Sequence, residues 1–130
     1  MKKIFLFIAI IALAVFSCKN NTSNQNAASL NYENLDVAGF KEKMDAGKVV
    51  ILDVRTAEEF EEGHIKGAIN FDVNKSSFTD KNIRMNEDIE YLVYCHSGRR
   101  SVKACNIMNN AGLKKLYNLE GGYVAWSKAQ

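Results

Sequence analysis

The chain has 130 residues, enough for one domain of ordinary size, and carries 17 basic and 15 acidic side chains. Because Lys2 and Lys3 lie in an apolar leader, the chain from Cys18 onward has 15 basic and 15 acidic residues. This balance argues against nucleic acid as a partner, since phosphate binding depends on a surplus of basic side chains. The spacing of the three cysteines fits neither a zinc site nor a CxxC dithiol, so we expect no metal and no cofactor.

Residues 1–17 have the pattern of a signal peptide. Lys2 and Lys3 form a basic start, and Ile4–Phe16 is an unbroken apolar run of 13 residues. As a helix this run is about 20 Å long, shorter than the hydrocarbon core of about 30 Å. This length favours a signal peptide over a membrane-spanning anchor.

The end of the leader, Val15-Phe16-Ser17-Cys18, resembles a bacterial lipoprotein cleavage site, although Phe16 is bulky where such sites carry a small residue. The resemblance implies that Cys18 is the lipidated first residue of the mature protein. The protein then lies on the periplasmic side of a bacterial membrane and contacts the membrane only through its lipid anchor. The alternative is secretion to the periplasm, with Cys18 inside an uncleaved or differently cleaved leader.

Residues 18–29 are predicted to form the lipidated cysteine and a flexible tether. From Lys19 to Ser29 no apolar side chain is larger than that of alanine, so this stretch cannot offset the entropy of ordering. The folded domain is predicted to cover residues 30–130.

Within this domain, helical and extended patterns alternate. Asp36 is a helix N-cap and Gly47 a stop signal, which together predict a helix that ends near Met44. The pattern then predicts, in order, a strand at 49–52, a short acidic helix at 56–62, a strand at 68–71, a helix at 76–85, a strand at 89–94, a helix from the N-cap Ser101 to Ala111, a strand at 116–119 and a terminal helix after Gly121-Gly122.

This alternation predicts an α/β fold with a central, mostly parallel sheet of about five strands and helices on both faces. Ligands of such sheets bind beyond the carboxyl ends of the strands. Cys95 directly follows the apolar run Ile89–Tyr94 and therefore lies at that end.

The loop after this strand favours a thiolate. Cys95 precedes Gly98, the cationic pair Arg99 and Arg100, and the start of a helix. Loop amides, the positive end of the helix dipole and nearby guanidinium groups all lower the pKa of a thiol. We therefore expect this loop to bind an anionic sulfur species.

Three separated motifs then resemble the rhodanese-like sulfurtransferase domain, over residues 31–128, here in a single-domain form carried on a lipoprotein leader. They are Asp53-Val54-Arg55 with Glu59-Phe60 and Gly63-His64-Ile65-Lys66-Gly67-Ala68-Ile69-Asn70, then Cys95-His96-Ser97-Gly98-Arg99-Arg100-Ser101, and finally Leu119-Glu120-Gly121-Gly122-Tyr123-Val124-Ala125-Trp126.

The resemblance implies that Cys95 takes a sulfane sulfur from thiosulfate or polysulfide, holds it as a persulfide and passes it to cyanide or a thiol. The amides of residues 96–100 would point inward and stabilise the terminal sulfur, with His96, Ser97 and Gly98 completing the substrate loop. Arg100 would hold the anionic donor, and Arg99 would steer it.

Several other residues have a supporting or alternative interpretation. Asp53 and Arg55 close a strand at the ligand end, where pairing with local carboxylates is favoured over contact of Arg55 with substrate. His64 is interpreted as a hydrogen-bonded turn residue. Packing in a helix is favoured for Cys105 over a disulfide with Cys95.

The sequence leaves two other functions open. One is a non-catalytic binding or redox-sensing module that uses Cys95 as a reversible thiol. The other is a phosphatase-like or arsenate-reductase-like hydrolase. In those relatives five residues separate the cysteine from the arginine, whereas four separate Cys95 from Arg100, and this shorter loop favours sulfur.

The identity of the donor also stays open. The loops of the two-domain thiosulfate enzymes carry a lysine and a threonine where Ser97 and Arg100 stand here. The sequence distinguishes neither the physiological acceptor, nor the inner from the outer membrane, nor the oligomeric state.

Overall fold

A five-stranded parallel sheet forms the centre of the domain in the computed structural model, which describes residues 31–82 and 84–130. The strands lie in the order β1-β5-β4-β2-β3, so β4 is in the middle. Their bounds are Glu33–Leu35 (β1), Val49–Asp53 (β2), Ile69–Asn70 (β3), Glu90–Tyr94 (β4) and Leu116–Leu119 (β5).

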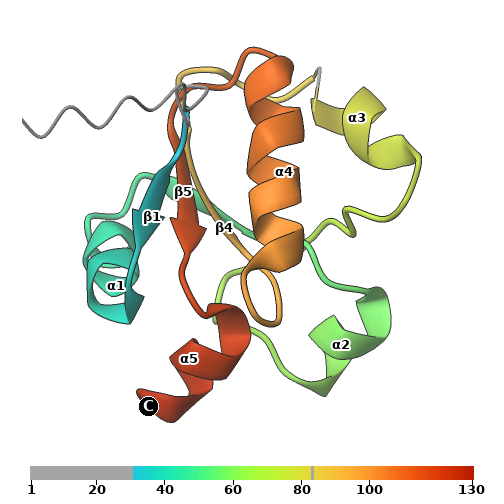
Figure 1. Ribbon diagram of the computed structural model, residues 1–130. Coiled ribbons are helices and arrows are strands. Elements are labelled where there is room, and N and C mark those ends of the chain that lie inside the picture. The colour runs from blue at the N-terminus through green and yellow to red at the C-terminus, as the bar shows by residue number, and fades with distance from the viewer. Residues whose placement is uncertain (1–30, 83) are drawn as a thin grey trace, which may run out of the picture.

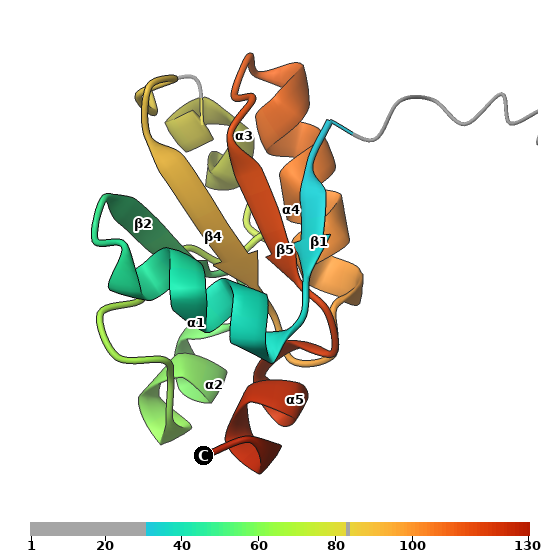
Figure 2. The same ribbon diagram turned by 90° about the vertical axis from the view of Figure 1, so that its left-hand side faces the viewer.

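Helices cover both faces of this sheet, as Figures 1 and 2 show from two sides. Their bounds are Val37–Asp45 (α1), Ala57–Glu62 (α2), Ser77–Asn82 (α3), Arg99–Asn110 (α4) and Gly122–Lys128 (α5). Helices α3 and α4 pack on one face, and α1 and α5 on the other. The predicted α/β architecture is confirmed.

Alternate side chains of the central strands supply two separate cores. On the α4 face, Leu52 and Val93 pack with Met108, whereas on the α1 face Leu92 packs with Phe40. Both faces of β2 and β4 are therefore buried, which explains why these strands are continuous apolar runs in the sequence.

Strand β1 was not among the predicted elements. It contains one apolar residue, Leu35, and it lies at the sheet edge, where Glu33 and Leu35 pair with Tyr117 and Leu119 of β5. A segment of this composition becomes a strand through its tertiary pairing, since strand propensity depends strongly on context.

The prediction that Ser101 caps a helix is wrong. The N-cap of helix α4 is Gly98, three residues before the predicted cap, and Ser101 lies inside the first turn. Gly98 has φ +107°, a conformation that side-chain-bearing residues rarely adopt, so the chain can turn directly from the loop into the helix. Helix α3 is also shorter than the predicted 76–85.

The predicted signal peptide 1–17 and the tether 18–29, with Cys18, lie outside the described residues. In residues 31–82 and 84–130, the helices are all too short or too polar to cross a membrane.

Candidate active site

Cys95 lies at the carboxyl end of the central strand. It directly follows Tyr94, the last residue of β4, and the chain then turns through Gly98 into α4 (Figure 1). The side chain of Cys95 is 1% exposed and forms part of a pocket wall. The parallel sheet thus places the thiol at the edge where ligands of such folds bind.

Hydrogen-bond donors surround the sulfur atom. The amide of Gly98 donates to Cys95 Sγ over 3.0 Å, and Ser101 Oγ lies 3.4 Å from the same sulfur. Burial alone raises the pKa of the Cys95 thiol. The Ser101 hydroxyl and the amides of Ser101, Gly98 and Ser97 outweigh burial, so the net pKa is below its ordinary value. The site favours the thiolate, which is the nucleophilic form.

The Ser101 hydroxyl has two acceptors within reach but only one proton. Ser101 Oγ also donates to the carbonyl oxygen of Gly98 over 3.0 Å. While Cys95 is a thiol, its S–H group can donate to Ser101 Oγ, and the Ser101 hydroxyl continues to donate its hydrogen bond to the Gly98 carbonyl oxygen. When Cys95 is ionised, rotation of the hydroxyl gives the sulfur a further donor.

Helix α5 holds the carbonyl groups of the loop. The amide of Tyr123 donates to the Cys95 carbonyl over 2.8 Å, and that of Val124 donates to the His96 carbonyl over 3.1 Å. Those oxygens therefore point toward α5. At Gly122 a Cβ atom would lie 2.5 Å from the Cys95 oxygen, so this close approach requires glycine.

Cationic side chains surround the pocket in front of Cys95. It has a volume of about 500 Å³, and its lining residues among those described are Cys95, Ser97, Arg99, Arg100 and Lys103. None of them is acidic, so the pocket suits an anion.

These cations differ in their availability. Arg100 Nη1 and Nη2 contact the carboxylate of Glu59 over 2.6 and 2.8 Å, so this guanidinium is already paired. Arg99 and Lys103 are exposed, and within residues 31–82 and 84–130 neither forms an ion pair. Lys103 was not singled out in the sequence, although it lies one helical turn after Arg99 and therefore on the same side of α4.

Asp53 and Arg55 form a buried ion pair outside this pocket. Arg55 Nη2 lies 2.6 Å from Asp53 Oδ2 and 2.7 Å from the carbonyl oxygen of Gly63, to which it donates. The guanidinium also lies over the ring of Tyr123, 4.3 Å from its centroid. The pair joins β2, the turn after α2 and α5, and it is the carboxylate pairing of Arg55 that the sequence favoured.

The remaining candidates, His64, His96 and Cys105, are not among the described residues that line the pocket in front of Cys95. His64 stacks on Phe60, with ring centroids 3.7 Å apart, and its Nδ1 lies 2.8 Å from the Phe60 carbonyl oxygen. His96 is exposed at the start of the loop. Cys105 is buried in the α4 core and is not joined to Cys95, and burial raises the pKa of its thiol to about 12.

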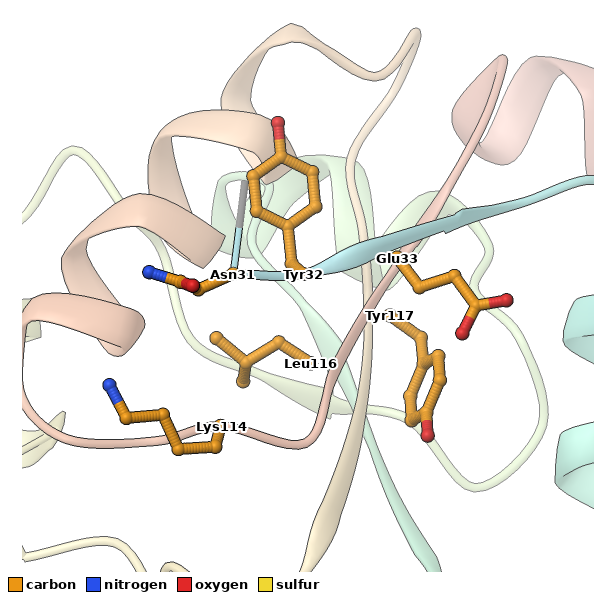
Figure 3. Close-up of a pocket in the computed structure, with 6 residues that line it drawn as sticks. All are labelled: Asn31, Tyr32, Glu33, Lys114, Leu116 and Tyr117. Carbon is orange, nitrogen blue, oxygen red and sulfur yellow. The ribbon is translucent and has the colours of Figure 1, made fainter. Parts of the chain in front are cut away.

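A different hollow, shown in Figure 3, lies at the start of β1 and β5 and has a volume of about 320 Å³. Tyr32, Leu116 and Lys114 are among the residues around it. Because the strands are parallel and Cys95 follows the end of β4, this hollow is at the opposite end of the sheet. Its described lining contains neither cysteine nor histidine, so it offers no thiol to carry sulfur.

Comparison with protein families gives a match to the rhodanese-like domain over residues 36–129. The chain is 33% identical over 98 residues to the putative sulfurtransferase YtwF of Bacillus subtilis, covering 75% of this chain and 92% of that protein. It is 36% identical over 104 residues to thiosulfate sulfurtransferase 18 of Arabidopsis thaliana, covering 71% and 76% of the two chains.

Another relative is longer than the shared domain. The putative sulfur carrier protein YrkF of Bacillus subtilis is 35% identical over 106 residues, which are 81% of this chain but only 55% of that protein. Among solved structures, a rhodanese-like domain protein from Staphylococcus aureus superimposes with a TM-score of 0.65 at 30% identity, over 72% of this chain and 90% of that one.

Proposed function

The chain belongs to the rhodanese-like domain family, and we propose that it is a sulfurtransferase that carries a sulfane sulfur on Cys95. One observation carries this proposal: Cys95 Sγ lies at the end of the central strand, beside the Gly98 amide and the Ser101 hydroxyl. This environment stabilises a sulfur anion, which is what both the resting thiolate and its persulfide require.

In the first half-reaction, the Cys95 thiolate attacks the outer sulfur of thiosulfate. A bond forms between Sγ and that sulfur, the bond within thiosulfate breaks, and its electron pair leaves with sulfite. The enzyme then carries Cys95–S–S⁻, and the total charge is unchanged. A polysulfide donor reacts in the same way, with the shortened polysulfide as the leaving group.

Arg99 and Lys103 are the cations that we assign to the donor. Both contribute to the pocket wall, whereas the guanidinium of Arg100 is engaged by Glu59. Two positive side chains one turn apart favour a dianion such as thiosulfate over a monoanion. In this proposal Arg100 stabilises the Cys95 loop and supplies positive charge at the rim of the pocket.

In the second half-reaction, cyanide or a thiolate attacks the outer sulfur of the persulfide. The bond to Cys95 Sγ breaks, and its electron pair restores the thiolate. Amides beside Sγ are already oriented toward it, because α5 holds the Cys95 and His96 carbonyl groups on the other side. This arrangement supports the sulfur anion in both steps without rearrangement.

We propose that this chemistry takes place on the periplasmic side of a bacterial membrane, to which lipidated Cys18 anchors the chain. The support is the Ser17-Cys18 junction after the apolar leader. Expression in a Gram-negative bacterium followed by membrane fractionation tests this. Wild-type chain should sediment with membranes, and Cys18→Ser should not; equal sedimentation of both would contradict the anchor.

Intact-mass measurement after incubation with thiosulfate tests the sulfurtransferase proposal. The full chain should gain about 32 Da, the mass of one sulfur atom, and lose it on addition of cyanide. Cys95→Ser should abolish the gain and Cys105→Ser should preserve it. A Cys95-dependent oxidation without sulfur loading would favour the redox module, and Cys95-dependent turnover of an aryl phosphate would favour the hydrolase.

A further inference from the structure

The hollow at the start of β1 and β5, which we call the strand-start hollow, differs in charge from the pocket in front of Cys95. The described residues that line it are Asn31, Tyr32, Glu33, Lys114, Leu116 and Tyr117. The described lining of the Cys95 pocket contains basic side chains and no acidic ones, whereas the strand-start hollow has one charged side chain of each sign. It therefore suits a ligand that carries both a positive and a negative group.

The two charged side chains of this hollow are available to a ligand. Glu33 and Lys114 are exposed, and within residues 31–82 and 84–130 neither forms an ion pair. Lys114 Nζ contacts Asn109 Oδ1 over 3.5 Å, a length at the limit of a hydrogen bond, so the ammonium group is weakly held. Figure 3 shows the Glu33 carboxylate and the Lys114 ammonium group on opposite sides of the hollow. This arrangement fits an elongated zwitterion better than a compact ion.

Aromatic and aliphatic side chains form the rest of the wall. Leu116 is buried, and Tyr32 and Tyr117 are half-buried. The Tyr117 hydroxyl donates to Glu90 Oε1 over 2.8 Å and accepts from Lys43 Nζ over 2.9 Å, so its ring is held in place. Tyrosines that present an apolar ring on one side and meet water on the other are common where proteins contact the boundary of a membrane.

The hollow lies where the chain enters the domain. Asn31, the first residue that the structure describes, is part of its wall. Cys18, the proposed lipid anchor, precedes Asn31 by 13 residues, which span at most about 45 Å. The lipid headgroups of the same membrane are thus present at an effective concentration in or above the millimolar range. A site of millimolar affinity would therefore be occupied in the anchored chain.

We propose that the strand-start hollow binds the headgroup of an ethanolamine phospholipid, with Lys114 on the phosphate and Glu33 on the ammonium group. This inference rests on the proposed Cys18 anchor. A primary ammonium group donates hydrogen bonds to a carboxylate, whereas the quaternary ammonium group of a choline lipid has no N–H donor. The hollow should therefore prefer ethanolamine over choline.

Such a contact determines the direction in which the Cys95 pocket opens. β4 runs from the hollow's end of the sheet to Cys95, and its five residues span roughly 17 Å. The Debye length at physiological ionic strength is about 8 Å, half of this distance. The negative potential of a membrane surface is therefore screened at the pocket, where a thiosulfate dianion has to arrive. The pocket opens away from the membrane and takes its donor from solution.

Titration with soluble headgroups tests the ligand. The full chain, purified in detergent, is titrated with glycerophosphoethanolamine and followed by its amide chemical shifts. Binding should saturate in the millimolar range and shift the amides of Glu33 and Leu116. Glu33→Gln and Lys114→Gln should each weaken the affinity about three- to tenfold, as expected for one lost charged contact. Glycerophosphocholine should bind at least about threefold more weakly, and inorganic phosphate should not saturate.

Two charge-matched variants at the Cys95 end of the molecule are the controls. Glu61→Gln in α2 and Lys128→Gln in α5 remove the same charges from exposed positions (Figure 1). Both should bind glycerophosphoethanolamine as wild type does. Absence of saturable binding, equal affinity for the two headgroups, or equal weakening by the control variants would overturn the proposal. Inorganic phosphate that binds as tightly as the headgroup would also overturn it, because the hollow would then be a simple anion site.

Lipid nanodiscs distinguish a membrane headgroup from a free small molecule. The chain purified from bacterial membranes is placed in discs of phosphatidylcholine with or without phosphatidylethanolamine. The ethanolamine lipid should shift the amides of Glu33 and Leu116 and leave those of the Cys95 loop unchanged. Shifts at the Cys95 loop instead, or no shift in a chain that binds the soluble headgroup, would overturn the membrane contact.

None of these measurements depends on sulfur transfer. A chain that binds the headgroup but gains no sulfur from thiosulfate would overturn the proposed function and support the strand-start hollow. Conversely, a chain that forms the persulfide but never binds the headgroup would overturn the hollow alone.

Discussion

Glu59 and Arg100 form a bidentate ion pair that joins α2 to the Cys95 loop. The two contacts are 2.6 and 2.8 Å, and the same carboxylate accepts the amide of Thr56 over 3.0 Å in the capping box of α2. One side chain therefore fixes both the start of a helix and the guanidinium at the rim of the pocket.

The pair predicts a pH-dependent stability difference. Replacing Glu59 by Gln should lower the free energy of unfolding at pH 7 by about 1 kcal/mol, because the pair is only partly buried. Arg100 first, and then the Thr56 amide, lower the pKa of Glu59 from 4.5 to about 2 against the effect of burial. A lowered folded-state pKa means that this stability is present above pH 4.5 and is lost as pH falls toward 2.

Urea unfolding of wild type and Glu59→Gln between pH 2 and 7 measures this difference. The difference in the free energy of unfolding between wild type and Glu59→Gln should be constant near pH 7. It should shrink as the pH falls below about 4.5. Glu61→Gln, an exposed position on the same helix, serves as the control and should match wild type at neutral pH. A gap that persists at pH 2 would mean that Glu59 acts through packing and not through its charge.

The two described cysteines should differ in reactivity. The donors around Cys95 lower the pKa of its thiol despite burial, whereas burial raises the pKa of Cys105 to about 12. Iodoacetamide at pH 7 should therefore alkylate Cys95 more than about tenfold faster than Cys105, as peptide mass mapping would show. Both should react alike in denaturant, and comparable rates in the folded chain would contradict the placement of the thiolate.

Ser101→Ala should shift the alkylation of Cys95 to higher pH, because it removes the side-chain donor that most favours the thiolate. In a Cys105→Ala background, Ser101→Ala should lower the rate of Cys95 alkylation at pH 7 about two- to tenfold. Ser127→Ala, an exposed serine of α5, is the matched control. An unchanged pH profile would show that the Ser101 hydroxyl donates to the Gly98 carbonyl and not to the Cys95 thiolate.

Much of the fold follows from local signals in the sequence. Asp36 caps α1 through its side chain, which accepts the amide of Gly39, and the continuous apolar runs became β2 and β4. Strand β1 could not be predicted in the same way, because Glu33–Leu35 acquires its extended structure by pairing with β5, more than 80 residues later. Local pattern predicts elements, but it does not predict pairing.

The candidate active site was also predictable from the sequence only in part. The position of Cys95 at a strand end follows from the sequence, whereas the partner of Arg100 does not, since Glu59 is 41 residues away. The family resemblance implied that Arg100 holds the donor, whereas in the structure its guanidinium contacts Glu59. Helical spacing from Arg99 could have identified Lys103, once α4 was known to begin at Arg99.

Arg99 and Lys103 should control the affinity for thiosulfate. Arg99→Ala and Lys103→Ala should each raise KM about three- to tenfold with little change in kcat, because a rim charge contributes to encounter and binding more than to the chemical step. The effect should shrink as salt is added. Lys114→Ala, an exposed lysine at the opposite end of the sheet, is the control, and a fall in kcat alone would contradict a donor-binding role.

Gly122 should be intolerant of any side chain, for a reason that can be separated from backbone strain. Gly122 and Gly67 both have positive φ, 57° and 84° respectively. A Cβ atom at Gly67 would meet nothing within 4 Å. A Cβ atom at Gly122 would lie 2.5 Å from the Cys95 carbonyl oxygen and 2.6 Å from that of His96. Gly67→Ala should therefore cost about 1–2 kcal/mol of stability with unchanged sulfur loading. Gly122→Ala should cost about 3–5 kcal/mol, because steric overlap adds to the strain.

Gly122→Ala should also slow persulfide formation on Cys95. The overlap pushes α5 away from the loop, so the carbonyl groups of Cys95 and His96 lose the amides of Tyr123 and Val124 that hold them. Those carbonyls can then turn toward the sulfur, where a negative dipole opposes the thiolate. Urea unfolding and the rate of persulfide formation, both measured at a temperature where each variant is folded, test this link. If Gly122→Ala were destabilised but still formed the persulfide at the wild-type rate, α5 would stabilise the fold without orienting the loop.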